Sequence, residues 1–332
     1  MTVAAAAALR PPSMLDPTAP AYKDWLHLNV LDHASGVVGL VNVSLHGDPA
    51  DPRSRAVGTA LLHVPDRGWY GNTEVTGLRD TRIDVAGIGL EHVAIAVRGE
   101  EVLASAHLPD DELALDLIGT FAAPAIFAEQ PLPLGTGWIG WFGIPRLRAR
   151  GRARVGPVDV DLAEASVYHD HNWGRWHWGD DFGWEWGCFL TPDPGPAFVF
   201  TRITDRAHTP SDGLVFVVHG GRRRAFASGA VDISWSGTLS AEPRRLPGAV
   251  AALHHDRAAP RLPAAVAIAA DDGIDRVELA CEARAAAQLI AADPTQPGYG
   301  FIHELVGAFR YECRLGGVDS DGSGLAVVEY VD

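Results

Sequence analysis

Residues 168–187 read YHDHNWGRWHWGDDFGWEWG, and this run decides the fold prediction. Five tryptophans lie in it, interleaved with histidine, aspartate, asparagine and glutamate. Side chains alternate between the two faces of an extended strand, so Tyr168, Asp170 and Asn172 share one face. Aromatic walls with a few convergent polar groups are typical of a pocket for an apolar ligand. The run therefore predicts strands that line a binding site.

Alternating apolar and polar segments continue on both sides of this run, and glycine and proline fall mostly between them. They are residues 25–30, 37–46, 56–64, 92–98, 146–155, 158–162, 184–190, 197–203, 214–219, 231–235, 309–315 and 325–331. Many short strands with Gly/Pro turns are typical of sandwiches and barrels, which predicts an all-β chain with few short helices. Residues 113–126 and 276–290 are rich in alanine or leucine and fit either a helix or a strand.

Bulk composition narrows the classes of partner. The formal net charge is −15, which disfavours binding to nucleic acid. The longest apolar runs fall short of 18 residues, so stable insertion into a membrane is not expected. The three cysteines are far apart in the sequence, which indicates a reducing compartment and a cytoplasmic protein.

Two carboxyl groups are the candidate catalytic acids and bases. Asp170, beside Tyr168 and walled by tryptophan, would be poorly solvated; desolvation favours its neutral form, so it could act as a general acid. Glu185 is the second candidate, because Gly183 and Gly187 share its face and would leave space for a ligand. The expected substrate-binding residues are Trp141, Asn172, His171, Trp173, Trp184 and Trp186.

Plainer interpretations of the same residues stay open. Asp170 could serve only as a structural hydrogen-bond partner between strands, and any single tryptophan could be core packing. His169 and His171, two apart on a strand, could begin a metal site with ligands drawn from His177, Asp181 and Glu185. We favour no metal and no cofactor.

The run YHDHNWG (168–174), followed by a strand of the form WxWGxxFxWEWG (176–187), resembles the carotenoid 1,2-hydratase and AttH-like family. This hydroxyneurosporene synthase-like, lipocalin-like family includes related cofactor-free cyclases. The resemblance implies two lipocalin-like β-barrel or sandwich domains packed together, which we place at residues 21–175 and 176–332 after a disordered tail at 1–20. The hydratase tyrosine and aspartate match Tyr168 and Asp170, and the upstream tryptophan matches Trp141. Where the hydratases have a histidine two residues earlier, this chain has Ile139.

The expected function is that of a cofactor-independent acid–base enzyme. Its partner would be a hydrophobic small molecule, a polyene or isoprenoid-like substrate whose double bonds it hydrates or cyclises. One alternative is a pericyclase of the Diels-Alderase type in natural-product biosynthesis, in which the pocket mainly preorganises one conformer. Another is a non-enzymatic lipocalin-like carrier of a hydrophobic ligand.

Overall fold

The computed structural model describes residues 22–47, 51–227, 229–246, 261–293 and 297–332, so the tail predicted at 1–20 lies outside the described residues. Antiparallel strands dominate, and the helices in the described ranges are two single 3-10 turns, η2 (Leu78–Asp80) and η3 (Pro109–Asp111). The all-β prediction is confirmed. The chain divides into a first unit, residues 1–181 with 291–300, and a second unit, residues 182–290 with 301–332.

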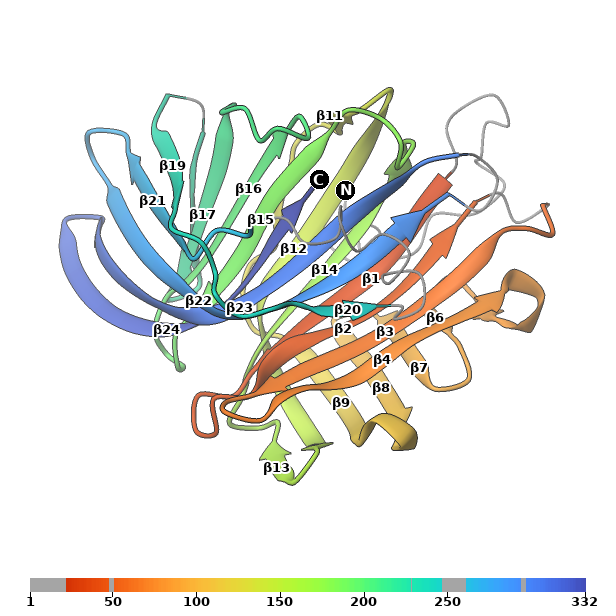
Figure 1. Ribbon diagram of the computed structural model, residues 1–332. Helices are drawn as coiled ribbons and strands as arrows, with labels where there is room; N and C mark the ends of the chain where they lie inside the picture. The colour runs from red at the N-terminus through yellow and green to blue at the C-terminus, as the bar shows by residue number, and fades with distance from the viewer. Residues whose placement is uncertain (1–21, 48–50, 228, 247–260, 294–296) are drawn as a thin grey trace. The chain divides into compact units, whose positions relative to one another are not determined.

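The first unit is built on one curled sheet (Figure 1). Its strands are β1 (Tyr22–Leu31), β2 (Val38–His46), β3 (Arg55–Val64), β4 (Gly68–Gly77), β5 (Arg82–Ile83), β6 (Gly87–Gly89), β7 (Val93–Arg98), β8 (Glu101–Leu108), β9 (Leu113–Phe121), β10 (Ile126–Phe127), β11 (Leu132–Leu134), β12 (Gly137–Val155), β13 (Val158–Asp161) and β14 (Ser166–Arg175). The main order is β4-β3-β2-β1-β14-β12-β9-β8-β7-β6-β5.

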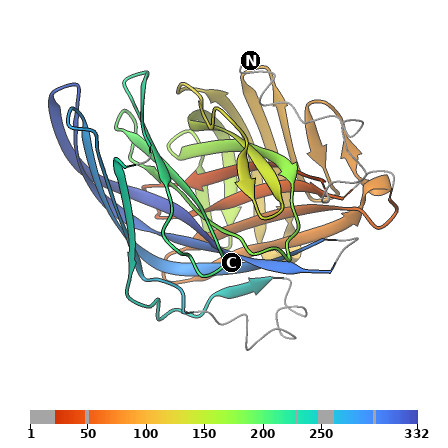
Figure 2. The ribbon, with the colours of Figure 1, turned by 90° about the horizontal axis from the view of Figure 1, so that it is seen from above.

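The two arms of this sheet lie on either side of one apolar core. Figure 2 shows the red-orange strands of one arm and the gold strands of the other. Strands β2 and β3 both contact β7. A Cβ atom on Gly58 in β3 would lie 2.9 Å from Val93 Cβ in β7, so the layers approach closely here. The core draws Leu26 and Leu28 from β1 and Phe142 from β12.

The second unit is a separate curled sheet with its own core. Its strands are β15 (Gly183–Leu190), β16 (Ala197–Thr204), β17 (Gly213–His219), β18 (Arg222–Phe226), β19 (Val231–Ser236), β20 (Arg244–Leu246), β21 (Ala265–Asp271), β22 (Arg276–Ala292), β23 (Tyr299–Leu315) and β24 (Val318–Val331). The main order is β18-β17-β16-β15-β24-β23-β22-β21-β19, and β17 contacts β19. The interior is aromatic, with Phe189, Phe198 and Phe309 packed edge to face.

Strand β12 positions the candidate site in the first unit. Its first half pairs with β14, and its second half pairs with β9. The register shifts between Ile144 and Leu147, where Pro145 lies and cannot donate a backbone hydrogen bond. Before the shift, Trp141 lies opposite Asn172 and Gly143 lies opposite Asp170.

Candidate functional site

Four of the predicted residues meet around one carboxyl group. Tyr168 Oη lies 3.0 Å and Trp141 Nε1 3.3 Å from Asp170 Oδ2, and Asn172 Nδ2 lies 2.8 Å from Asp170 Oδ1. We call Tyr168, Asp170, Asn172 and Trp141 the Asp170 cluster. Alternation along β14 puts three of them on one face, and the β12–β14 register supplies the fourth.

The Asp170 cluster is buried, with relative exposures between 0% for Tyr168 and 8% for Asn172. The indole and amide N–H groups can only donate, so both oxygens of Asp170 accept hydrogen bonds. Those donors offset the desolvation of the carboxyl group. The Tyr168 hydroxyl donates to Oδ2 over 3.0 Å, so one hydrogen bond links the phenol to the carboxyl group.

Gly143, which sequence reasoning missed, makes room for this contact. A Cβ atom at position 143 would lie 2.6 Å from Tyr168 Oη and 3.3 Å from Trp141 Cζ2. The strand therefore needs a residue without a side chain opposite Asp170. The signal in the sequence is a glycine two residues after Trp141, inside an otherwise bulky strand.

A second polar group lies on the same face, one strand away. His27 and Asn29 of β1 pair with Asp170 and Tyr168 in the antiparallel register. His27 Nε2 lies 3.1 Å from Asn29 Oδ1, and Asn42 Nδ2 lies 3.3 Å from His27 Nδ1. Burial lowers the pKa of His27 to about 4, so its ring is neutral near pH 7. Sequence reasoning missed these residues because only the strand pairing brings them beside β14.

The predicted binding residues His171 and Trp173 lie on the opposite face of β14, toward the core of the first unit. His171 Nε2 lies 2.8 Å from Asp24 Oδ1, Tyr22 donates to Asp24 Oδ2 at 2.6 Å, and the His171 and Trp173 rings are 4.7 Å apart. The structure thus separates these two residues from the Asp170 cluster. Within the described ranges, no group of three or more His, Cys, Asp or Glu is arranged to hold a metal ion.

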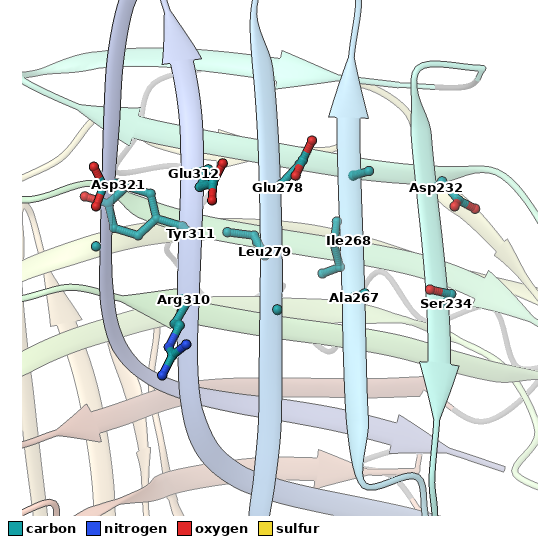
Figure 3. Close-up of a pocket in the computed structure, with 13 residues that line it drawn as sticks. Asp232, Ser234, Ala267, Ile268, Glu278, Leu279, Arg310, Tyr311, Glu312 and Asp321 are labelled. Carbon is teal, nitrogen blue, oxygen red and sulfur yellow. The ribbon is translucent and has the colours of Figure 1, made fainter.

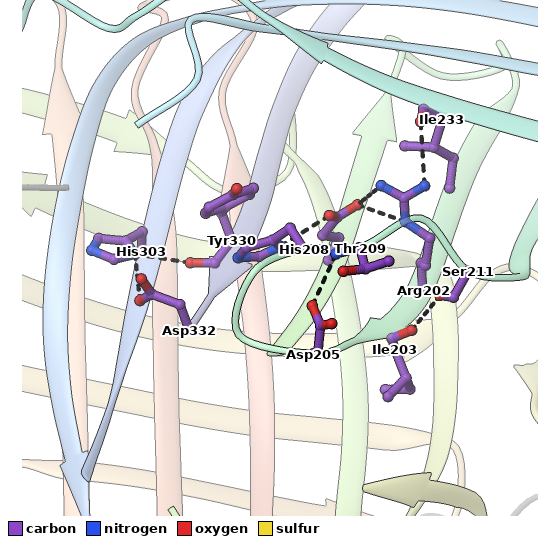
Figure 4. Close-up of polar contacts among 11 residues, drawn as sticks. Arg202, Ile203, Asp205, His208, Thr209, Ser211, Ile233, His303, Tyr330 and Asp332 are labelled. Carbon is purple, nitrogen blue, oxygen red and sulfur yellow. Dashed lines mark hydrogen bonds and ion pairs between the residues drawn. The ribbon is translucent and has the colours of Figure 1, made fainter. Parts of the chain in front are cut away.

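Glu185 lies in the second unit and is fully buried. It forms ion pairs with Arg202 and His208, which Figure 4 labels. Arg202 Nη2 and Nε lie 2.6 and 2.9 Å from Glu185 Oε2, and His208 Nδ1 lies 3.0 Å from Oε1. The expected free space beside it is absent: a Cβ on Gly187 would meet Phe200 at 2.8 Å, and one on Gly183 would meet the Val331 carbonyl at 2.4 Å. The expectation of space at these glycines was wrong, because neighbouring strands fill it.

Trp184 and Trp186 alternate with Glu185 along β15 and are 6% and 5% exposed. Trp184 Nε1 donates to Glu329 Oε2 at 2.7 Å, and burial raises the pKa of Glu329 to about 7. Glu329 was not a predicted residue; its signal is a lone carboxyl in the apolar run of β24.

The second unit also carries an open groove of about 500 Å³ across β19 and β21–β24 (Figure 3). Its polar lining consists of exposed side chains, among them Glu278, Arg310, Glu312 and Asp321. None of the predicted site residues lines it. In the described part of the chain, no helix has the length and apolar character needed to cross a membrane.

No protein-family model matches this sequence, and no curated protein is detectably similar to it in sequence. Solved structures do match its fold. An AttH-like protein from Nitrosomonas europaea has a TM-score of 0.67 at 14% identity, covering 95% of this chain and 96% of that chain. Kievitone hydratase from Nectria haematococca has a TM-score of 0.63 at 12% identity, covering 99% and 94%. CghA, solved with Sch210972, has a TM-score of 0.57 at 10% identity, covering 97% and 94%. The chain therefore shares the fold of these proteins, the one that its tryptophan-rich motif predicted.

Proposed function

We propose that this protein is a cofactor-independent acid–base enzyme acting on the double bonds of a hydrophobic polyene or isoprenoid-like substrate. The observation that carries the proposal is the Asp170 cluster, in which Tyr168 and Asp170 share a hydrogen bond in a buried setting beside the indole of Trp141. Kievitone hydratase, with the same fold, is named for a hydration, and this supports hydration over the carrier alternative.

In the hydration route, the Tyr168–Asp170 pair gives one proton to a double bond of the substrate. The cation that forms is stabilised by the electron-rich face of an indole such as Trp141. Water adds to the cation and returns one proton to the pair, so the net change is the addition of one water. Asn172 keeps Oδ1 of Asp170 in place through its 2.8 Å hydrogen bond. In the cyclisation route, an internal double bond takes the place of water.

Asp170→Asn tests this assignment, because the amide cannot take part in the proton transfer but has nearly the same shape. We expect turnover to fall at least a hundredfold, on the order of a lost general acid. A strain lacking the gene would be complemented with the wild type, with Asp170→Asn or with the control Asp116→Asn, an exposed carboxyl of β9. Cell extracts would then be compared by mass spectrometry.

The product's mass identifies the reaction. A product heavier than the accumulated precursor by one water indicates hydration, and a product of equal mass with a different retention time indicates cyclisation. Full activity of Asp170→Asn would remove the acid–base assignment. Extracts that do not differ between the deletion strain and its parent would favour the carrier.

A further inference from the structure

His208 lies in the second unit, on the connection between β16 and β17, and points at a buried carboxylate (Figure 4). Its Nδ1 lies 3.0 Å from Glu185 Oε1, and its side chain is 9% exposed. A carboxylate accepts from Nδ1–H and so fixes the tautomer that leaves a lone pair on Nε2. Among the described residues, His208 Nε2 is buried and has no hydrogen-bond partner.

The backbone of His208 adopts a strained conformation while its ring contacts Glu185. Its φ is +55°, in the left-handed region that residues with a side chain rarely adopt. The turn is held by the Asp205 carbonyl, which accepts from His208 N at 3.0 Å, and by Asp205 Oδ1, which accepts from Thr209 N at 2.9 Å. The ring stacks on Tyr330, with centroids 3.7 Å apart and planes 12° apart. Several contacts therefore fix one orientation of the imidazole.

Arg202 completes the arrangement from β16. Its guanidinium contacts Oε2 of Glu185 and donates to the Ile233 carbonyl at 3.2 Å, which leaves Oε1 for His208. A second unpartnered donor, Trp235 Nε1, belongs to a ring that packs edge-on against Tyr330 at 5.1 Å. Both His208 and Trp235 therefore contact the ring of Tyr330, and each has a buried nitrogen without a hydrogen-bond partner among the described residues.

We propose that Glu185 and His208 form a second acid–base centre inside the second unit, in which His208 Nε2 takes a proton from water or from the hydroxyl of a small molecule. Glu185 is the positioning residue: it holds Nδ1–H and stabilises the imidazolium that forms when Nε2 is protonated. The proposal stands on the second unit alone and does not depend on Asp170. It also gives Glu185 a role different from that of the direct acid or base expected from the sequence.

Diethyl pyrocarbonate tests the proposal, since it acylates the bare nitrogen of an imidazole. Nε2 attacks a carbonyl carbon and ethyl carbonate leaves as an anion. The Nδ1 proton passes by way of Glu185 and solvent to that anion, which breaks down to ethanol and carbon dioxide. We expect His208 to react at least tenfold faster than His303, as read from peptides by mass spectrometry. His303 is the matched control, because Gln288 and the Tyr330 carbonyl engage both of its nitrogens. The charged and titratable groups around His208 are Glu185, Arg202, Asp205, Arg206, His303, Tyr330 and Asp332.

Glu185→Gln should slow the reaction of His208 several-fold and leave that of the exposed His107 unchanged. Asp170→Asn should leave His208 as reactive as in the wild type, so this test and that of the proposed function can fail separately. A purely structural His208 would be as inert as His303, which would overturn the proposal. Nitrogen NMR of the wild-type imidazoles gives a second measurement: a proton on Nε2 instead of Nδ1 in the neutral ring would overturn it as well.

Discussion

At the scale of single residues, the Asp170 cluster depends on Gly143, which has no Cβ atom to displace Tyr168. Gly143→Ala would put a Cβ 2.6 Å from Tyr168 Oη, and the phenol would have to leave Asp170. We expect a loss of about 1–3 kcal/mol in the free energy of unfolding, as for other overpacked sites, together with a loss of activity. Urea unfolding and the complementation assay measure both. Gly77→Ala is the control, because its Cβ would meet only Asp80 Oδ2, at 3.7 Å. Equal behaviour of the two variants would contradict the role of Gly143.

The sequence alone predicts part of the Asp170 cluster but not the partners of Glu185. Alternation along residues 168–172 was enough to put Tyr168, Asp170 and Asn172 on one face, because a strand has a fixed period of two. The partners of Glu185 could not be found in this way. Arg202 is 17 residues away and His208 is 23 residues away, and both reach Glu185 only through strand register and loop conformation.

At the scale of elements, strand β22 shows how composition competes with pattern. Alanine favours helices, which made residues 276–290 ambiguous. The segment nevertheless alternates, and Val277, Leu279 and Cys281 enter the core of the second unit. Tertiary burial decided the outcome over local propensity. Residues 291–300, which begin with the last two residues of this strand, belong to the first unit, and the alternation along the strand did not mark that change.

A buried ion pair joins Asp293, the residue after strand β22, to Lys23 in strand β1 of the first unit. Lys23 of β1 is fully buried; its Nζ lies 2.6 Å from Asp293 Oδ1 and donates to the Trp176 carbonyl at 2.6 Å. Asp293 Oδ2 also accepts from Trp178 N at 2.9 Å. Lys23→Met would leave a buried carboxylate without its cation, and we expect a loss of about 3–5 kcal/mol in the free energy of unfolding.

Urea unfolding checks the value, with Arg154→Met as the control. Arg154 pairs with Asp159 on the surface, where water screens the charges, so this variant should change stability far less. The double variant Lys23→Met/Asp293→Asn should regain part of the loss, since it removes the stranded charge. A Lys23→Met variant no weaker than Arg154→Met would show that the pair does not secure the connection.

At the scale of the whole molecule, buried titratable groups are divided unequally between the two units. In the first unit, burial lowers the pKa of His27 to about 4 and the pKa values of His46 and His169 to about 3. In the second unit, burial lowers the pKa of His303 to about 4 but raises that of Glu329 to about 7. A fall in pH should therefore change the free energy of unfolding of the two units by different amounts.

The free energy of unfolding rises or falls with pH according to whether the unfolded or the folded state binds more protons. Below pH 6.5 an unfolded histidine is protonated while a buried neutral one is not, so the stability it contributes is present above pH 6.5 and is lost as the pH falls toward 4. Each such histidine removes about 2 kcal/mol between pH 7 and 5. Glu329 acts in the opposite direction, because its folded form holds a proton that the unfolded form releases above pH 4.5.

We therefore expect the first unit to be destabilised by acid through three histidines, while His303 and Glu329 nearly cancel in the second unit. Urea unfolding at pH 7 and pH 5, followed by brief proteolysis and peptide mapping, measures each unit separately. At pH 5, peptides from residues 22–181 should be released at clearly lower urea than at pH 7, and those from residues 182–290 at nearly the same urea. His107→Gln should leave both profiles unchanged, since that side chain is exposed. Equal acid sensitivity of both units would mean that burial of His27, His46 and His169 does not set the pH response, and that carboxylates common to both units control it instead.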